Sequence, residues 1–198
     1  MRSFLERCLS YMMRGLFWFR YRIKVKGLEK LNPKTLKKPG GMLFLPNHPA
    51  VLIDPVSAVQ AVLRKFSIRP MVVEQYYYFP LFHWALKFFR ALPMPDFEKG
   101  SSGLKRKRSE KVLEDVISGL KDGDNFLVYP AGATKGQGEE RIGGASGAHR
   151  IVSNAKEANV VLVRIKGLWG SSFSRALTGK PVNVKDALWH GLKVLLKN

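Results

Sequence analysis

Apolar residues along this chain fall into short runs that alternate with longer periodic stretches. Short runs of strand length occupy residues 22–26, 42–45, 70–74, 125–129 and 160–165. Helical patterns or helix start signals mark residues 54–65, 80–92, 109–120, 148–157 and 184–196. Strands that alternate with helices are typical of parallel sheets. The pattern therefore predicts an α/β fold: a single domain with a largely parallel sheet flanked by helices.

Residues 2–21 predict an N-terminal amphipathic helix. Charged residues interrupt every apolar run in it, so it is not expected to span a bilayer. Two interpretations stay open: an interfacial membrane helix, with Tyr11 and Trp18 as anchors, or a helix packed on the protein's own core. The predicted apolar face comprises Leu5, Cys8, Leu9, Met12, Leu16 and Phe19, and the polar face Arg2, Arg7, Ser10 and Arg14.

The charge balance indicates a polyanionic partner. The 198 residues include 34 Lys and Arg against 15 Asp and Glu, a net charge of +19. Nucleic acid and an anionic membrane surface both fit this charge. Six of the 22 aromatic residues lie in 4–21 and eight in 76–89, among aliphatic residues, which favours lipid. A basic nucleic-acid-binding protein remains the alternative. Residues 101–108, which include the basic run Lys105–Arg108, are expected to form a flexible loop.

Candidate chemistry lies just after the predicted strand 42–45. There, Asn47-His48 is followed by Asp54-Pro55, which has the form of a helix N-cap with proline in the first turn. Parallel sheets present functional groups at the carboxyl ends of their strands. His48 with a carboxylate partner can take a proton from a hydroxyl near neutral pH. The alternatives are a structural histidine in a loop and an aspartate that only caps a helix.

A second motif, Tyr129-Pro130-Ala131-Gly132-Ala133-Thr134, follows the predicted strand 125–129, and Gly147-Ala148-His149-Arg150 opens the next helix. Together with Asn47-His48 and Asp54, these stretches resemble the phospholipid and glycerol acyltransferase family, which includes lysophosphatidic acid acyltransferases. The resemblance covers nearly the whole chain. It divides the chain into a membrane-associating segment, 1–26, and an acyltransferase domain, 27–198. The chain ends two residues after Leu196, inside a predicted helix, as a fragment of a longer protein would.

The resemblance implies transfer of an acyl group from a thioester, on coenzyme A or acyl carrier protein, to a hydroxyl of a glycerolipid or lysophospholipid. His48 would be the general base and Asp54 its partner, with no metal and no cofactor beyond the acyl donor. The enzyme would sit peripherally on the cytoplasmic face of a membrane, which a single cysteine, Cys8, also fits. Substrate-binding residues would be Asn47, Pro130, Gly132, Lys135, Arg141 and Arg150, with backbone amides around Gly132 stabilising an oxyanion or a phosphate.

Three departures from the family pattern bear on the substrate. The spacer between His48 and Asp54 is five residues rather than four, and Ala131 replaces the usual glutamate. Met94–Phe97 occupies the place of an arginine that would bind the acceptor's phosphate. A phosphate would therefore need other partners, and Lys135, Arg141 and Arg150 surround the glycine-rich loop. A catalytically inactive member of the family that only binds lipid is a further alternative.

Overall fold

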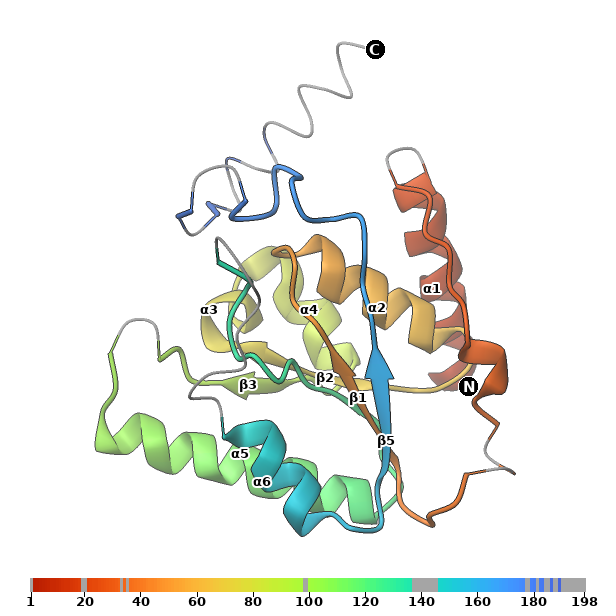
Figure 1. Cartoon of the computed structure of the whole chain (residues 1–198), viewed down its shortest axis with the longest axis vertical. Coiled ribbons are helices and arrows are strands. Elements are labelled where there is room, and N and C mark those ends of the chain that lie inside the picture. The colour runs from red at the N-terminus through yellow and green to blue at the C-terminus, as the bar shows by residue number, and fades with distance from the viewer. Residues whose placement is uncertain are drawn as a thin grey trace.

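The structure is a computed structural model of the whole chain (Figure 1). It describes residues 2–176 except for 19–20, 33, 35, 98–99 and 137–145. Beyond residue 176 it describes only 179–180, 182–183, 186 and 189. The predicted helix 184–196 therefore lies almost entirely outside the described residues.

A parallel sheet forms the centre of the fold. Within the described residues it has five strands, in the order β3-β2-β4-β1-β5, and every neighbouring pair is parallel. The expected α/β fold with a largely parallel sheet is confirmed. The strands are β1 (Met42–Pro46), β2 (Arg69–Val73), β3 (Leu92–Met94), β4 (Phe126–Leu127) and β5 (Asn159–Val163).

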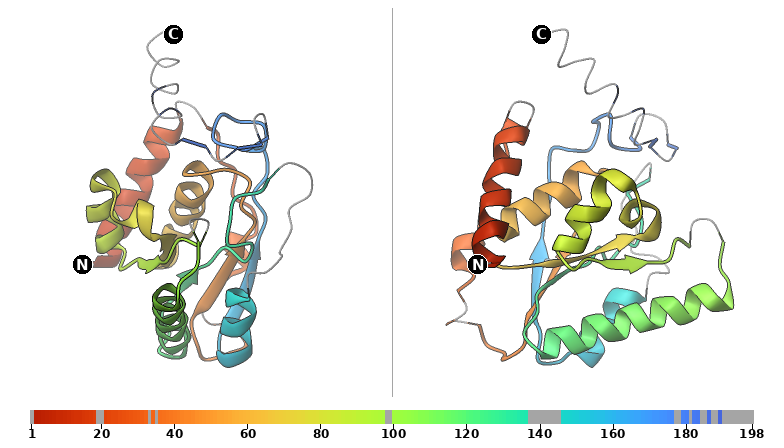
Figure 2. Two further views of the ribbon diagram at one scale, coloured as in Figure 1. Left: turned by 90° about the vertical axis from the view of Figure 1, so that its left-hand side faces the viewer. Right: turned by 180° about the vertical axis from the view of Figure 1, so that it is seen from behind.

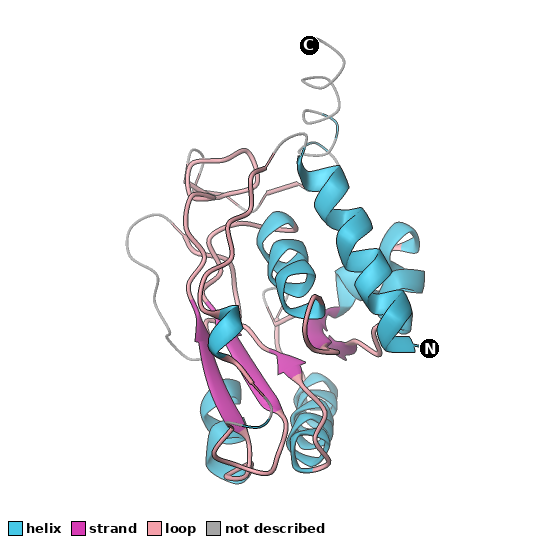
Figure 3. Ribbon diagram, turned by 90° about the vertical axis from the view of Figure 1, so that its right-hand side faces the viewer, coloured by secondary structure: helices cyan, strands magenta, loops and turns pink. Residues whose placement is uncertain are grey.

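Helices cover both faces of the sheet (Figures 1 and 3). One layer contains α1 (Arg2–Trp18), α2 (Ile53–Leu63), α3 (Glu74–Tyr77) and α4 (Pro80–Phe88), and a short 3-10 helix, η1, spans Leu28–Lys30. The other layer contains α5 (Gly103–Lys121) and α6 (Gly147–Asn154), which pack against each other. Among the described residues, no helix is both long and apolar enough to cross a membrane.

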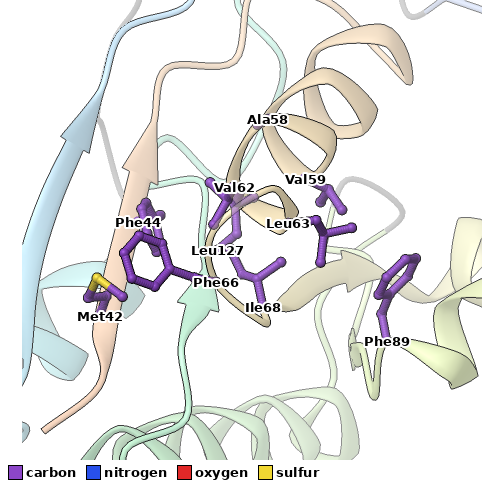
Figure 4. Packing of buried hydrophobic residues seen from close by; sticks show 10 residues of the cluster. All are labelled: Met42, Phe44, Ala58, Val59, Val62, Leu63, Phe66, Ile68, Phe89 and Leu127. Carbon is purple, nitrogen blue, oxygen red and sulfur yellow. The ribbon is translucent and has the colours of Figure 1, made fainter. Parts of the chain in front are cut away.

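Alternate residues of the central strands face the two layers, as the pleat of a strand requires. Met42 and Phe44 of β1 pack with the α2 side chains Ala58, Val59 and Val62 (Figure 4). Leu43, between them, packs instead with α5 and α6. Both strand faces are therefore buried, which explains the continuous apolar runs in the sequence.

Some predicted elements differ from the structure. Residues 22–26 form no strand, and β3 and α3 were not predicted. The predicted loop 101–108 is the first part of α5, because Ser102 caps that helix by accepting a hydrogen bond from the Lys105 N–H at 3.2 Å. Lys and Arg are good helix formers, so a basic run continues a helix readily once its start is capped.

Helix α1 packs on the body through a polar face. Glu6 and Ser10 are fully buried in this interface: Glu6 accepts a hydrogen bond from the Ser67 hydroxyl at 3.0 Å, and the Ser10 hydroxyl donates to the Gln60 carbonyl at 2.8 Å. Ser10, a residue of the predicted polar face, therefore points toward the body of the protein. Leu9 of the predicted apolar face packs on the core. The rest of that face, as far as its side chains are described, is exposed: Leu5, Cys8 and Met12.

Candidate active site

The structure brings His48 and Asp54 into direct contact. The His48 Nδ1 and the Asp54 Oδ2 lie 2.7 Å apart. The Asp54 side chain is completely buried, whereas 18% of the His48 side chain is exposed. A buried carboxylate on one ring nitrogen fixes the orientation of the imidazole and favours the tautomer with the proton on Nδ1. The lone pair that can accept a proton is then on Nε2.

The contact depends on how the chain turns between β1 and α2. Helix α2 begins at Ile53, two residues before Pro55, the predicted first helical residue, so Asp54 lies inside the first turn and is not the N-cap. Its Oδ2 also accepts the Ala50 N–H at 3.4 Å. Leu52 occupies the N-cap position with a φ of 65°, a strained conformation for a residue other than glycine. This turn points Asp54 back toward His48.

A second loop supports that turn from outside. The Val51 N–H donates to the carbonyl oxygen of Phe173 at 2.8 Å. Ala50 and Ile53 form a small buried cluster with Leu168 and Phe173. The segment after β5 thus holds the loop between β1 and α2 in place, and with it the strained residue Leu52. Strained residues persist where the surrounding structure over-determines them, often at functional sites.

Tyr129, just beyond β4, lies against the imidazole. The centroids of the Tyr129 and His48 rings are 4.1 Å apart, with the planes at 31°. Tyr129 is partly exposed as a residue, but its hydroxyl oxygen is buried and has no hydrogen-bond partner among the described residues. Burial and, second, the carboxylate of Asp54 raise the pKa of Tyr129 well above its ordinary value of 10.0. The phenol is therefore neutral over the working range of an enzyme.

The side chain of Asn47 joins the segments that follow β1 and β5. Its Nδ2 donates to the Ile165 carbonyl at 3.0 Å, and its Oδ1 accepts the Ile165 N–H at 2.6 Å. Both ends of the carboxamide are thereby occupied. These hydrogen bonds fix the segment after β5 next to the His48 loop, and binding of substrate by Asn47 stays a prediction.

An open pocket of about 400 Å³ lies beside this pair of strands. Asn47 and Pro49, on either side of His48, form part of its wall. Lys135 reaches it from the loop after β4, and the Lys135 N–H donates to the His48 carbonyl at 2.8 Å. The remaining lining residues follow β5 or end it: Val163, Arg164, Ile165, Lys166, Gly167 and Trp169.

Two of the other residues expected to bind substrate, Pro130 and Gly132, lie just after β4. They form a turn; Gly132 has a φ of 70°, and its N–H donates to the Tyr129 carbonyl at 3.1 Å. That N–H, expected to stabilise an oxyanion, is therefore used within the turn. Arg141 lies outside the described residues.

Arg150 is placed elsewhere. It lies on α6, near Glu110 and Glu114 of α5 with N–O distances of 3.9 and 3.6 Å, and lines a different pocket with α5 residues. The two pockets share no lining residue. We therefore do not retain Arg150 in the candidate site.

Comparison with known families decides what kind of protein carries this site. A family model described as acyltransferase matches residues 22–166, which include the whole sheet and the His48–Asp54 pair. The chain belongs to the acyltransferase family. The family expected from the sequence motifs is thus confirmed, and the protein is an acyltransferase.

Solved structures include one similar to this acyltransferase. It is the 1-acyl-sn-glycerophosphate (LPA) acyltransferase PlsC from Thermotoga maritima, with 14% sequence identity and a TM-score of 0.46. The similarity covers 85% of this chain and 76% of that one. Comparison with curated proteins gives no match.

Four residues of the candidate site were not predicted from the sequence to have a role in it: Tyr129, Arg164, Lys166 and Trp169. For Arg164 and Lys166 a signal was available: both lie at the carboxyl end of an apolar run of strand length, at the same edge of the sheet as His48. Trp169 lies in a loop whose path the sequence does not specify.

Proposed function

We propose that this acyltransferase moves a fatty acyl group from a thioester, on coenzyme A or acyl carrier protein, to a hydroxyl of a glycerolipid or lysophospholipid. The observation that carries the proposal is the contact of 2.7 Å between His48 and the buried Asp54.

In the proposed reaction, His48 works as a general base. Its Nε2 takes the proton of the acceptor hydroxyl as the oxygen attacks the thioester carbonyl, and a tetrahedral intermediate forms. When the C–S bond breaks, the imidazolium returns the proton to the leaving thiolate. Asp54 stays ionised and stabilises the imidazolium, as the carboxylate of a catalytic triad does. General-base assistance of this kind contributes roughly 10²–10⁴ in rate.

The outward face of α1 supports attachment to an anionic membrane. Phe4, Tyr11, Met12 and Trp18 are all more than half exposed. Arg7 and Arg14 lie beside this apolar stripe, on a chain whose net charge is +19. Because the inward face of α1 is held by buried polar contacts, the stripe keeps a fixed direction relative to the sheet.

Helix α4 extends the same side of the molecule. In the right-hand view of Figure 2, α1 and α4 both lie on the side toward the viewer. Trp84 of α4 is 74% exposed. Amphipathic helices with aromatic residues on one face and basic residues beside it bind the interface of anionic bilayers. We propose that this side of the protein rests on the membrane.

The function is tested by an acyl-transfer assay on the full chain. Labelled acyl-coenzyme A and acyl carrier protein donors are offered with a panel of lysophospholipids and monoacylglycerol, and His48→Ala is the control. We expect transfer with at least one donor and acceptor, lowered at least about a hundredfold in a folded His48→Ala protein. No transfer with any pair would favour an inactive lipid-binding member of the family. Equal transfer by His48→Ala would remove His48 from the mechanism.

A further inference from the structure

Three cationic side chains converge on the pocket beside His48 without a counter-charge. Lys135, Arg164 and Lys166 line it, and no acidic residue does. None of the three pairs with a carboxylate among the described residues. Some basic side chains elsewhere in the fold are paired: Arg69 and Arg90 with Asp124, and Arg108 with Glu74. Lys135, Arg164 and Lys166 thus bring three positive charges, without a carboxylate among the lining residues, to one pocket next to the proposed base.

Their positions are fixed by the surrounding chain. Arg164 and Lys166 flank Ile165, whose backbone N–H and carbonyl are both held by the Asn47 side chain. Residues two apart on extended backbone point to the same side. The ammonium of Lys135 lies over the ring of Trp169, 4.4 Å from its centroid. A cation–π contact restrains a flexible lysine without neutralising its charge.

We infer that this pocket binds a phosphate group of a substrate. Resting on the proposed function, the inference adds a substrate class: the phosphate belongs either to a phosphorylated acceptor or to the coenzyme A donor. Guanidinium and ammonium groups are the usual protein partners of phosphate. Since Asn47 and Pro49 both flank His48 and line the pocket, a phosphate held there would tether its substrate beside the imidazole.

The pocket replaces the phosphate site expected from the sequence. Of the three residues expected there, Lys135 lines the pocket and Arg150 faces α5. Arg164 and Lys166 supply the cations that Arg150 does not. The chain has Met94–Phe97 where relatives are expected to carry a phosphate-binding arginine, so a phosphate site built on the end of β5 would compensate for that departure.

The test measures binding directly, so that it does not depend on turnover. Calorimetry on the full chain uses 1-hexanoylglycerol 3-phosphate, 1-hexanoylglycerol, coenzyme A and dephospho-coenzyme A, all below the concentrations at which they aggregate. Soluble probes remove any contribution from membrane attachment. The variants are Arg164→Gln and Lys166→Gln, and the control is Lys156→Gln, an exposed lysine in the turn between α6 and β5. All are measured again in the His48→Ala background.

We expect a phosphate-bearing probe to bind at least about tenfold more weakly to Arg164→Gln and Lys166→Gln, as loss of a hydrogen bond to a charged group predicts. Lys156→Gln should bind it normally. Weakening confined to hexanoylglycerol phosphate assigns the phosphate to the acceptor, and weakening confined to coenzyme A assigns it to the donor. Dephospho-coenzyme A then distinguishes the 3′-phosphate from the pyrophosphate.

The inference is overturned if both phosphate probes bind all variants like the wild type, or if neither probe binds the wild type. If hexanoylglycerol binds as tightly as its phosphate, the phosphate is not that of the acceptor. Its failure differs from failure of the proposed function. A protein that binds a phosphate probe through these residues but transfers no acyl group keeps the pocket and loses the reaction. A protein that transfers acyl groups but binds the phosphate probes equally in all variants keeps the proposed function and overturns the inference about the pocket.

Discussion

The ring of His48 lies over the ring of Tyr129, with centroids 4.1 Å apart and planes at 31°. The two residues follow neighbouring parallel strands, His48 after β1 and Tyr129 after β4. Asp54 holds the imidazole at Nδ1, and Tyr129 covers one of its faces. Together they restrict both the rotation and the tilt of the proposed base. Positioning of this kind is one of the main sources of rate in enzymes.

Replacing Tyr129 by Phe keeps the ring and removes the hydroxyl. Because the hydroxyl oxygen is buried with no hydrogen-bond partner in the described part of the chain, its removal should raise the free energy of unfolding by about 1 kcal/mol. Turnover should stay within about threefold of wild type, because the contact with His48 involves the ring. Urea unfolding and acyl-transfer kinetics measure the two effects.

Tyr129→Leu is the matched variant, since it removes the ring. We expect turnover to fall about tenfold at unchanged KM, as a misplaced base predicts. If Tyr129→Phe instead loses more than about 1 kcal/mol of stability, the hydroxyl has a partner, and the positioning role would pass from the ring to that hydrogen bond.

The raised pKa of Tyr129 predicts a dependence of stability on alkaline pH. Its pKa in the folded protein lies well above 10.0 through burial and the nearby Asp54, whereas in the unfolded chain it is close to that value. The folded state therefore retains a proton that the unfolded state loses. Below about pH 10 the residue makes no pH-dependent contribution; above it, stability falls as pH rises, by up to about 1.4 kcal/mol per pH unit.

This contribution is isolated by comparing wild type with Tyr129→Phe. The difference in their unfolding free energies should be constant from pH 7 to 9 and should shift in favour of the variant above pH 10. The comparison cancels the other tyrosines. A difference that stays constant through pH 11 would mean that Tyr129 ionises alike in both states.

Asp54→Asn tests the charge of the carboxylate separately from its shape. The amide keeps an oxygen that can accept from His48 but cannot stabilise an imidazolium, so turnover should fall by about 10²–10⁴. Unfolding free energy should change by less than about 1 kcal/mol, because Asp54 caps no helix and the hydrogen bond has a replacement.

Asp54→Ala provides the comparison for that prediction. It leaves the Nδ1–H of His48 without its buried acceptor, and a loss of about 1–3 kcal/mol of stability is expected in addition to the loss of turnover. Near-normal turnover in a folded Asp54→Asn protein would assign Asp54 a structural role only.

The sequence predicts well what local patterns determine. Apolar runs located four of the five strands to within a few residues, and the position of His48 after β1 followed from them. The contact between His48 and Asp54 was expected from the motif, but not its geometry. It depends on the positive φ of Leu52 and on Phe173, which lies far along the chain. Neither leaves a local signal.

Contacts between strands were the harder part. Asn47 was expected to bind substrate from the family resemblance, and its hydrogen bonds to Ile165, 118 residues away, were not expected. The parallel register that pairs Pro46 with Val163 brings these residues together. Pairing of distant strands is not encoded by periodicity within either strand. The same reason explains why Arg164 and Lys166 were not considered part of the site.

The exposed face of α1 gives the sharpest test of membrane attachment. Deleting residues 1–21 would remove the hydrogen bonds that Ser10 makes with Gln60 and Glu6 makes with Ser67. A loss of membrane binding could then not be distinguished from unfolding. Phe4→Ser combined with Met12→Ser changes only exposed side chains. The control is Leu104→Ser: Leu104 is equally apolar and 70% exposed, but it lies on α5 in the opposite layer.

Binding is measured by co-sedimentation with anionic vesicles at low and high salt. Burying each apolar side chain contributes up to about 1.5–3 kcal/mol, so the α1 variant should bind at least about tenfold more weakly. Each basic residue near the surface adds roughly 1 kcal/mol, so high salt should weaken wild-type binding without abolishing it. Leu104→Ser should bind like the wild type. If the α1 variant binds normally, or Leu104→Ser loses as much, the membrane contacts another surface and α1 serves only to cover α2.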